Sequence, residues 1–63
     1  MRFLITATTD GKHEGEIVEF DGHLTVGESL VYKDVDYKID AIEWNGNRVK
    51  IVSSNYIAVL EII

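Results

Sequence analysis

The chain alternates apolar with polar residues over short segments, and turn-forming residues separate these segments at intervals of about 8 to 12 residues. Alternation with a period of two places successive side chains on opposite faces of a β-strand. β-Branched and aromatic residues, which favour strands, dominate between the turns. The pattern therefore predicts an all-β domain, built as a small sandwich or barrel.

Turn signals delimit the predicted strands at several places: Asp10-Gly11, Asp21-Gly22, residues 33–36, Asn45-Gly46 and residues 53–55. The predicted strands cover residues 2–9, 16–20, 23–26, 27–32, 37–44 and 56–63, and the Asn45-Gly46 hairpin adds a strand after residue 47. In the first strand, we expect Phe3, Ile5 and Ala7 to share one face. The register of the hairpin within residues 16–26 stays open, because two turn geometries fit it equally well.

Asn45-Gly46 is the strongest local signal, since a type I′ turn needs positive φ at both central residues. A two-residue turn at these positions places Ile42 opposite Val49 as a core pair. Asp40 then lies opposite Ile51 on the core face. This conflict predicts a β-bulge near Asp40, which bends the strand.

The last predicted strand, residues 56–63, is apolar on both faces except at Glu61. A strand of this kind is central in its sheet or covered on both faces. We therefore expect it to pair on both sides, with the first strand as one neighbour, so that the barrel closes.

Two segments, Gly27-Glu28-Ser29-Leu30-Val31-Tyr32 and Tyr37-Lys38-Ile39-Asp40-Ala41-Ile42, precede the Asn-Gly hairpin. Together with the hairpin they resemble an SH3-like barrel over residues 27–52. The resemblance implies a five- to six-stranded antiparallel barrel, and the length of the chain predicts that residues 1–63 form a single domain. Barrels of this class commonly bind peptides, nucleic acids or other subunits, although fold alone does not fix function. An OB-like barrel is the alternative, and the short chain without a helix between its strands argues against it.

With 63 residues and no cysteine, the chain has neither a large core nor a disulfide to stabilise it. It also has more apolar positions than one face of each strand can bury, which indicates a partner subunit or an oligomer. No apolar run approaches the roughly 20 residues that span a bilayer, so we expect no membrane partner. The N-terminal apolar stretch is too short for a signal peptide, and the cytoplasm is taken as the default location.

The formal net charge is −5, and residues 10–28 account for all of it, with six acidic residues against Lys12, while the rest of the chain is balanced. An acidic domain repels phosphate backbones, although a basic face built from the second half of the chain stays open. The acidic segment is interpreted first as a solvated face. The alternative is a surface that imitates a nucleic-acid backbone, and the composition is compatible with a phage or mobile-element protein.

Residues with catalytic or metal-binding chemistry form no recognisable motif, so we expect no enzyme activity, no metal and no cofactor. The strand between His13 and His23 alone separates them by roughly 16 Å, which argues against a shared zinc site. The serines lie beside no residue pattern that activates a nucleophile.

Aromatic and basic residues in the second half are the candidate binding residues: Tyr32, Tyr37, Trp44, Arg48 and Lys50. Together with Tyr56, Lys33 and Lys38, they can form a stacking platform with a basic rim, which small barrels use to bind single-stranded nucleic acid. In the competing interpretation, the rings pack at the barrel ends and the cations pair with nearby acids. The leading hypothesis is thus a non-enzymatic module for protein–protein contacts, as an oligomer or assembly subunit, and single-stranded nucleic-acid binding is the alternative.

Overall fold

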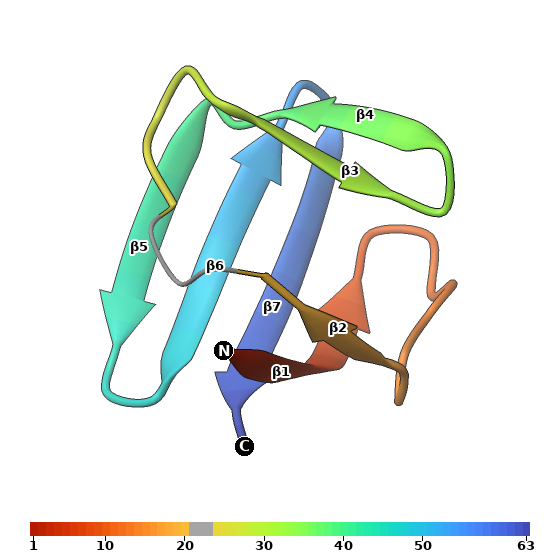
Figure 1. Ribbon diagram of the computed structural model, residues 1–63, viewed down its shortest axis with the longest axis vertical. Helices are drawn as coiled ribbons and strands as arrows, with labels where there is room; N and C mark the ends of the chain where they lie inside the picture. Colours follow the sequence, from red (N-terminus) through yellow and green to blue (C-terminus); the bar gives the residue numbers. More distant parts are fainter. Residues whose placement is uncertain (21–23) are drawn as a thin grey trace.

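The computed structural model describes residues 1–20 and 24–63, which form seven antiparallel strands and contain no helix. Five of these strands make one sheet in the order β2-β1-β7-β6-β5, and the other two make a separate hairpin, β3-β4 (Figure 1). The strand bounds are β1 Arg2–Thr8, β2 Ile17–Glu19, β3 Ser29–Tyr32, β4 Val35–Lys38, β5 Ala41–Asn45, β6 Arg48–Ser53 and β7 Tyr56–Ile62.

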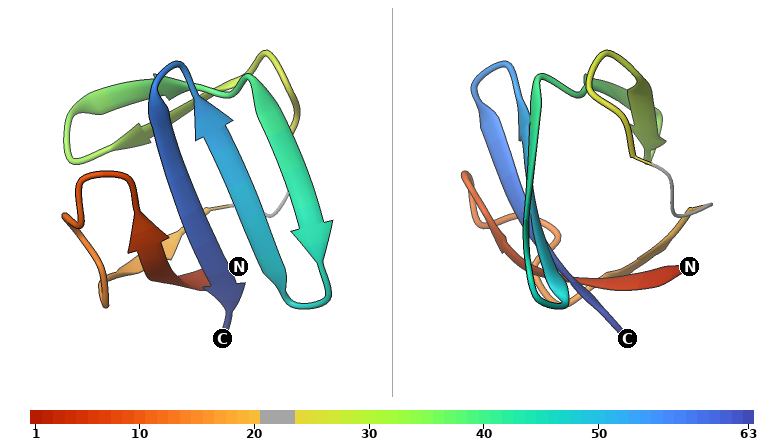
Figure 2. Two further views of the ribbon diagram at one scale, coloured as in Figure 1. Left: turned by 180° about the vertical axis from the view of Figure 1, so that it is seen from behind. Right: turned by 90° about the vertical axis from the view of Figure 1, so that its left-hand side faces the viewer.

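The β3-β4 hairpin lies across one face of the five-stranded sheet, near the end where β5 begins (Figure 1). Figure 2 shows that β1 and β2 turn out of the plane of β5, β6 and β7, so that the sheet curls toward the hairpin. The closed barrel expected from the sequence is not found among the described residues. β2 and β5 are the two edges of the sheet, and the hairpin shares a ladder with neither.

The expectation for the last strand is confirmed, because β7 pairs with β1 on one side and with β6 on the other. The predicted first and second strands are also present, each slightly shorter than expected. The predicted strand 23–26 is wrong for residues 24–26, which contain no strand. His23, the first residue of this predicted strand, lies outside the described residues. The Asp21-Gly22 turn and the register of the predicted hairpin within residues 16–26 also fall there.

The predicted strand 37–44 divides into β4 and β5, which belong to different sheets. Ile39 is buried, Asp40 and Ala41 both face solvent, and Ile42 is half-buried, so the alternation fails at this point. The Asp40 carboxylate accepts a hydrogen bond from the backbone N–H of Ser54, in the turn between β6 and β7. A strand break thus replaces the predicted bulge and redirects the chain from the hairpin into the large sheet.

The turn between β5 and β6 also differs from the prediction by one residue. Trp44 is opposite Val49 and Ile42 is opposite Ile51, so Gly46 and Asn47 are the central residues. Only Gly46 of these two has positive φ, at 64°, which fits a type II′ turn with glycine first. Ile42 and Val49 are therefore not partners, and the conflict at Asp40 that followed from that pairing does not arise.

The β3-β4 turn has positive φ at both central residues, 51° for Lys33 and 65° for Asp34, as a type I′ turn requires. This two-residue turn is tighter than the predicted turn over residues 33–36. It places Tyr32 opposite Val35 and Leu30 opposite Tyr37, so that Tyr32 and Tyr37 share one face of the hairpin.

The core lies between the hairpin and the concave face of the large sheet. Its buried side chains are Phe3, Ile5, Val18, Ile39, Val49, Ile51 and Leu60. The Phe3 ring stacks on that of Phe20 with centroids 4.4 Å apart, and Trp44 approaches Phe3 from β5 at 6.4 Å.

The prediction that Phe3, Ile5 and Ala7 share one face of β1 is wrong for Ala7, because the register of β1 shifts between Ile5 and Ala7. After the shift Ala7 is exposed, whereas Thr8 lies opposite Ala58 and lines the space between the sheets. The Thr6 hydroxyl donates a hydrogen bond to the backbone carbonyl of Val59 at 2.9 Å, next to the irregularity. The extra residue of a bulge bends its strand, which contributes to the curl of the sheet.

Ile51→Ala should lower the free energy of unfolding by about 2–5 kcal/mol, because truncation of this buried side chain leaves a cavity in the core. Ile17→Ala removes the same atoms from a side chain that is 49 % exposed, and we expect a loss of no more than about 1 kcal/mol. Urea unfolding at low protein concentration measures both. Equal losses would contradict the assignment of Ile51 to the core face and Ile17 to the outer face.

Candidate functional site

A cavity of about 60 Å³ lies between the hairpin and the concave face of the large sheet. We call it the inter-sheet cavity. The apolar floor on the large sheet consists of Ile5, Val18, Ile51, Ala58 and Leu60, and Leu30 closes the cavity from the hairpin. Six residues with polar atoms complete the lining: Thr8, His13, Tyr32, Tyr37, Ser53 and Tyr56.

Four of these lining residues have aromatic rings, and they come from four different parts of the chain. Tyr37 on β4 lies next to Tyr56 at the start of β7, with ring centroids 5.4 Å apart and ring planes inclined by 36°. His13, in the connection between β1 and β2, meets the Tyr32 ring edge-on at 5.4 Å. His13 has positive φ, 67°, a conformation that histidine adopts more readily than β-branched residues do.

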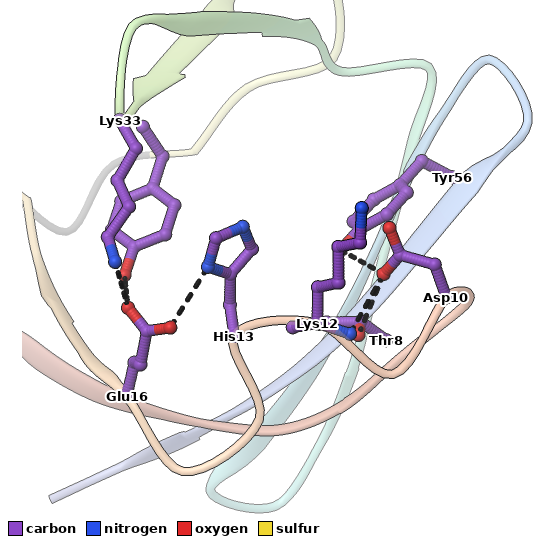
Figure 3. Close-up of polar contacts among 8 residues, drawn as sticks. Thr8, Asp10, Lys12, His13, Glu16, Lys33 and Tyr56 are labelled. Carbon is purple, nitrogen blue, oxygen red and sulfur yellow. Dashed lines mark hydrogen bonds and ion pairs between the residues drawn. The ribbon is translucent and has the colours of Figure 1, made fainter.

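The Glu16 carboxylate links the β1–β2 connection to the hairpin. Its Oε1 accepts hydrogen bonds from the Tyr32 hydroxyl and the Lys33 ammonium, each at 2.6 Å, and its Oε2 pairs with His13 Nδ1 at 2.9 Å (Figure 3). The hydrogen bonds from Lys33, Tyr32 and His13 lower the pKa of Glu16 to about 2. The same carboxylate raises the pKa of Tyr32 and of Lys33. We call these four residues the Glu16 cluster.

Asp10 holds the opposite side of the cavity in a similar way (Figure 3). Its Oδ1 accepts hydrogen bonds from the Lys12 backbone N–H at 3.0 Å and from the Tyr56 hydroxyl at 3.1 Å. The bond from the Lys12 backbone is the main cause that lowers the pKa of Asp10. Burial is the main cause that raises the pKa of Tyr56. A carboxylate therefore satisfies the hydroxyl of one tyrosine on each side of the cavity.

The outer face of the large sheet is the second candidate surface. The strand registers place five apolar side chains on this face, which we call the outer stripe: Leu4, Ile17, Val52, Ile57 and Val59. Ile17 is 49 % and Ile57 is 38 % exposed, and the other three are half-buried. The stripe consists of two apolar pairs in the registers, Leu4 with Ile17 and Val52 with Ile57, together with Val59, while Glu61 lies opposite Leu4 and Lys50 lies opposite Val59.

The structure does not bring the five predicted binding residues together. Tyr32 and Tyr37 face the inter-sheet cavity, and Trp44 lies at the edge of the core, next to Phe3. Arg48 and Lys50 lie on the outer face, where Arg48 Nε is 3.9 Å from a carboxylate oxygen of Glu61 and Lys50 is opposite Glu43. These five residues therefore occupy three separate surfaces. Nucleic-acid binding by the set stays a prediction.

Sequence reasoning grouped Tyr56 and Lys33 with Tyr32 and Tyr37, but it missed His13 and Glu16 as members of the same site. The available signal was the three-residue spacing of His13 and Glu16 beside Gly15, which is typical of a compact connection. Their contact with Tyr32 and Lys33, sixteen residues farther along, depends on how the hairpin lies over the sheet. No local pattern carries that information.

Comparisons with protein-family models, with curated proteins and with solved structures give no match for this chain. Within residues 1–20 and 24–63, no group of three His, Cys, Asp or Glu side chains is close enough to hold a metal ion. The same part of the chain has no helix with the length and apolar character needed to cross a membrane. The functional argument therefore depends on the geometry of the two surfaces.

Glu16→Gln should make the free energy of unfolding depend less on pH between 4.5 and 2. The folded-state pKa of Glu16, about 2, is below the ordinary value of 4.5, so its ionised form stabilises the fold. This contribution is complete above pH 4.5 and is lost as the pH falls to 2. Urea midpoints of wild type should therefore fall more steeply over this range than those of Glu16→Gln. Glu28→Gln, whose side chain lies outside the Glu16 cluster, is the control and should follow wild type.

Proposed function

We propose that this protein is a non-enzymatic interaction module that binds another protein subunit through the outer face of its large sheet. A second copy of the chain is the partner we propose first. The outer stripe is the observation that carries this proposal. A two-layer β-protein normally presents polar side chains on the outer face of its sheet.

The central strand of the sheet supports this interpretation most directly. β7 is flanked by β1 and β6, and it presents Ile57 and Val59 outward, with Ile57 opposite Val52 on β6 and Val59 opposite Ala7 on β1. A continuous exposed apolar patch costs solubility, and patches of this kind mark interaction surfaces. Contact with a partner would bury these side chains and add to the small core that 63 residues can build.

The charges beside the stripe suit a copy of the same surface. Arg48 and Lys50 on β6 lie between Glu61 on β7 and Glu43 on β5, so the outer face carries both signs close together. In a two-fold symmetric dimer the same patch meets itself in reverse orientation, which can place cations of one copy against acids of the other. The likeness of residues 27–52 to SH3-like barrels, which often bind other subunits, agrees with this proposal.

Nucleic-acid binding takes second place in this proposal. Stacking on aromatic rings requires them to share a surface with the cations that track the backbone. Tyr32 and Tyr37 face the cavity, whereas Arg48 and Lys50 lie on the outer face beside acidic residues. The net charge of −5 weakens the attraction further.

Val59→Lys should convert a dimer into a monomer, because it places a cation at the centre of the apolar stripe, opposite Lys50. Sedimentation equilibrium over a range of protein concentrations measures the mass of wild type and variant. Val31→Lys is the matched control: Val31 is 65 % exposed on the hairpin, away from the outer face, so this variant should remain dimeric. A wild-type chain that is monomeric at every concentration would refute self-association.

A further inference from the structure

We propose that the inter-sheet cavity binds a free, compact alkylammonium ion, with its methyl groups on the apolar floor and its positive charge against the surrounding aromatic rings. The cavity is separate from the outer stripe, so this proposal does not depend on the oligomeric state of the chain. It is based on three features: the size of the cavity, its aromatic wall and the Lys33 ammonium already held beside the Tyr32 ring.

The size of the cavity limits the ligand to a small group. Its volume is about 60 Å³. A water molecule needs about 10–15 Å³ on this scale, so there is room for roughly four or five non-hydrogen atoms. A tert-butyl or trimethylammonium group has this size. The floor, which includes Ile5, Val18 and Leu60, is complementary to methyl groups.

The aromatic wall favours a cation over a neutral group of the same shape. Tyr32, Tyr37, Tyr56 and His13 surround the cavity, and the face of an aromatic ring attracts a positive charge. The hydroxyls of Tyr32 and Tyr56 donate hydrogen bonds to carboxylates, which increases the electron density of these two rings. Among the lining residues there is no lysine or arginine to repel a cation.

The rim already holds a cation of the chain itself. The Lys33 ammonium lies 5.7 Å from the centroid of the Tyr32 ring and 2.6 Å from Glu16 Oε1. This arrangement shows that the ring and the carboxylate together accommodate an alkylammonium group. It also means that Lys33 opposes an incoming cation, so removal of its charge should strengthen binding.

Ser53 supplies a hydroxyl among the lining residues of the cavity. Within the described residues, no buried side-chain nitrogen or oxygen lacks a hydrogen-bond partner, so Ser53 is not an orphaned group. A hydroxyl oxygen has two lone pairs and can accept a further hydrogen bond. Ser53 is opposite Tyr56 in the β6–β7 ladder, so an N–H of a ligand bound beside the Tyr56 ring has an acceptor nearby.

The test is an NMR titration of the labelled chain with two probes of the same shape and size, tert-butylammonium and tert-butanol. We expect shifts at Thr8, Ala58 and Leu60 for both probes, with at least threefold tighter binding of tert-butylammonium than of tert-butanol, about the effect of one cation–π contact. Equal affinity for the ammonium and the alcohol, or no shift at these residues, would overturn the proposal.

Two lysine variants distinguish the effect of the charge at the rim on cation binding from the effect of the net charge of the chain. Lys33→Met removes the cation at the rim and should tighten tert-butylammonium binding about twofold or more. Lys38→Met removes a charge from the same hairpin, at a position opposite Ser29 and on the face away from the cavity, and should leave the affinity near that of wild type. Equal effects of the two variants, or weaker binding by Lys33→Met, would contradict a cation site at this rim.

Ser53→Ala tests the hydrogen bond without a large change in volume. It should weaken tert-butylammonium binding about threefold or more, and it should leave the affinity for tetramethylammonium, which has no N–H, close to that of wild type. A variant that binds both cations as wild type does would exclude Ser53 as the acceptor and overturn this part of the proposal. Amide spectra of the free variants confirm that the fold is kept.

Discussion

Side chains, rather than a shared ladder of backbone hydrogen bonds, hold the β3-β4 hairpin over the large sheet. In the part of the chain that the structure describes, the two sheets are separate, and the chain passes from one to the other at Ile39 and Asp40. Ile39 is 1 % exposed and fixes this crossing in the core, while Asp40 binds the turn between β6 and β7. Leu30 and Tyr37 pack inward from the hairpin, and the Glu16 cluster ties its turn to the β1–β2 connection.

The space between the two layers is filled differently at its two ends. At one end Phe3, Phe20 and Trp44 pack ring against ring, which leaves no polar atom to satisfy beyond the indole N–H. At the other end the aromatic residues are tyrosines, and a buried tyrosine hydroxyl needs a hydrogen-bond partner. Glu16 and Asp10 provide these partners, so carboxylates stand beside an apolar cavity. The acidic character of residues 10–28 is therefore partly structural rather than only a solvated surface.

Much of the secondary structure could be predicted from the sequence, because alternation and turn residues are local signals. The sequence also predicted that β7 has a neighbouring strand on each side, because its residues are apolar on both faces. The register at Gly46 could not be predicted, since the same residues fit two turn types that differ by one position. The division at Ile39 was hidden by strand-forming residues on both sides. For the site, Tyr32 and Tyr37 were recognised as candidates, but their cavity partners His13 and Glu16 depend on tertiary packing.

The strand break at Ile39 and Asp40 has a consequence for access to the interior. Because no ladder joins the two sheets among the described residues, contacts between side chains oppose separation of the hairpin from the large sheet, and no sheet hydrogen bonds do. Segments held in this way open at a lower free energy than the central strands of a sheet. The same feature that prevents closure of a barrel thus leaves the packing between the two layers, rather than backbone pairing, to determine how stable the cover over the cavity is.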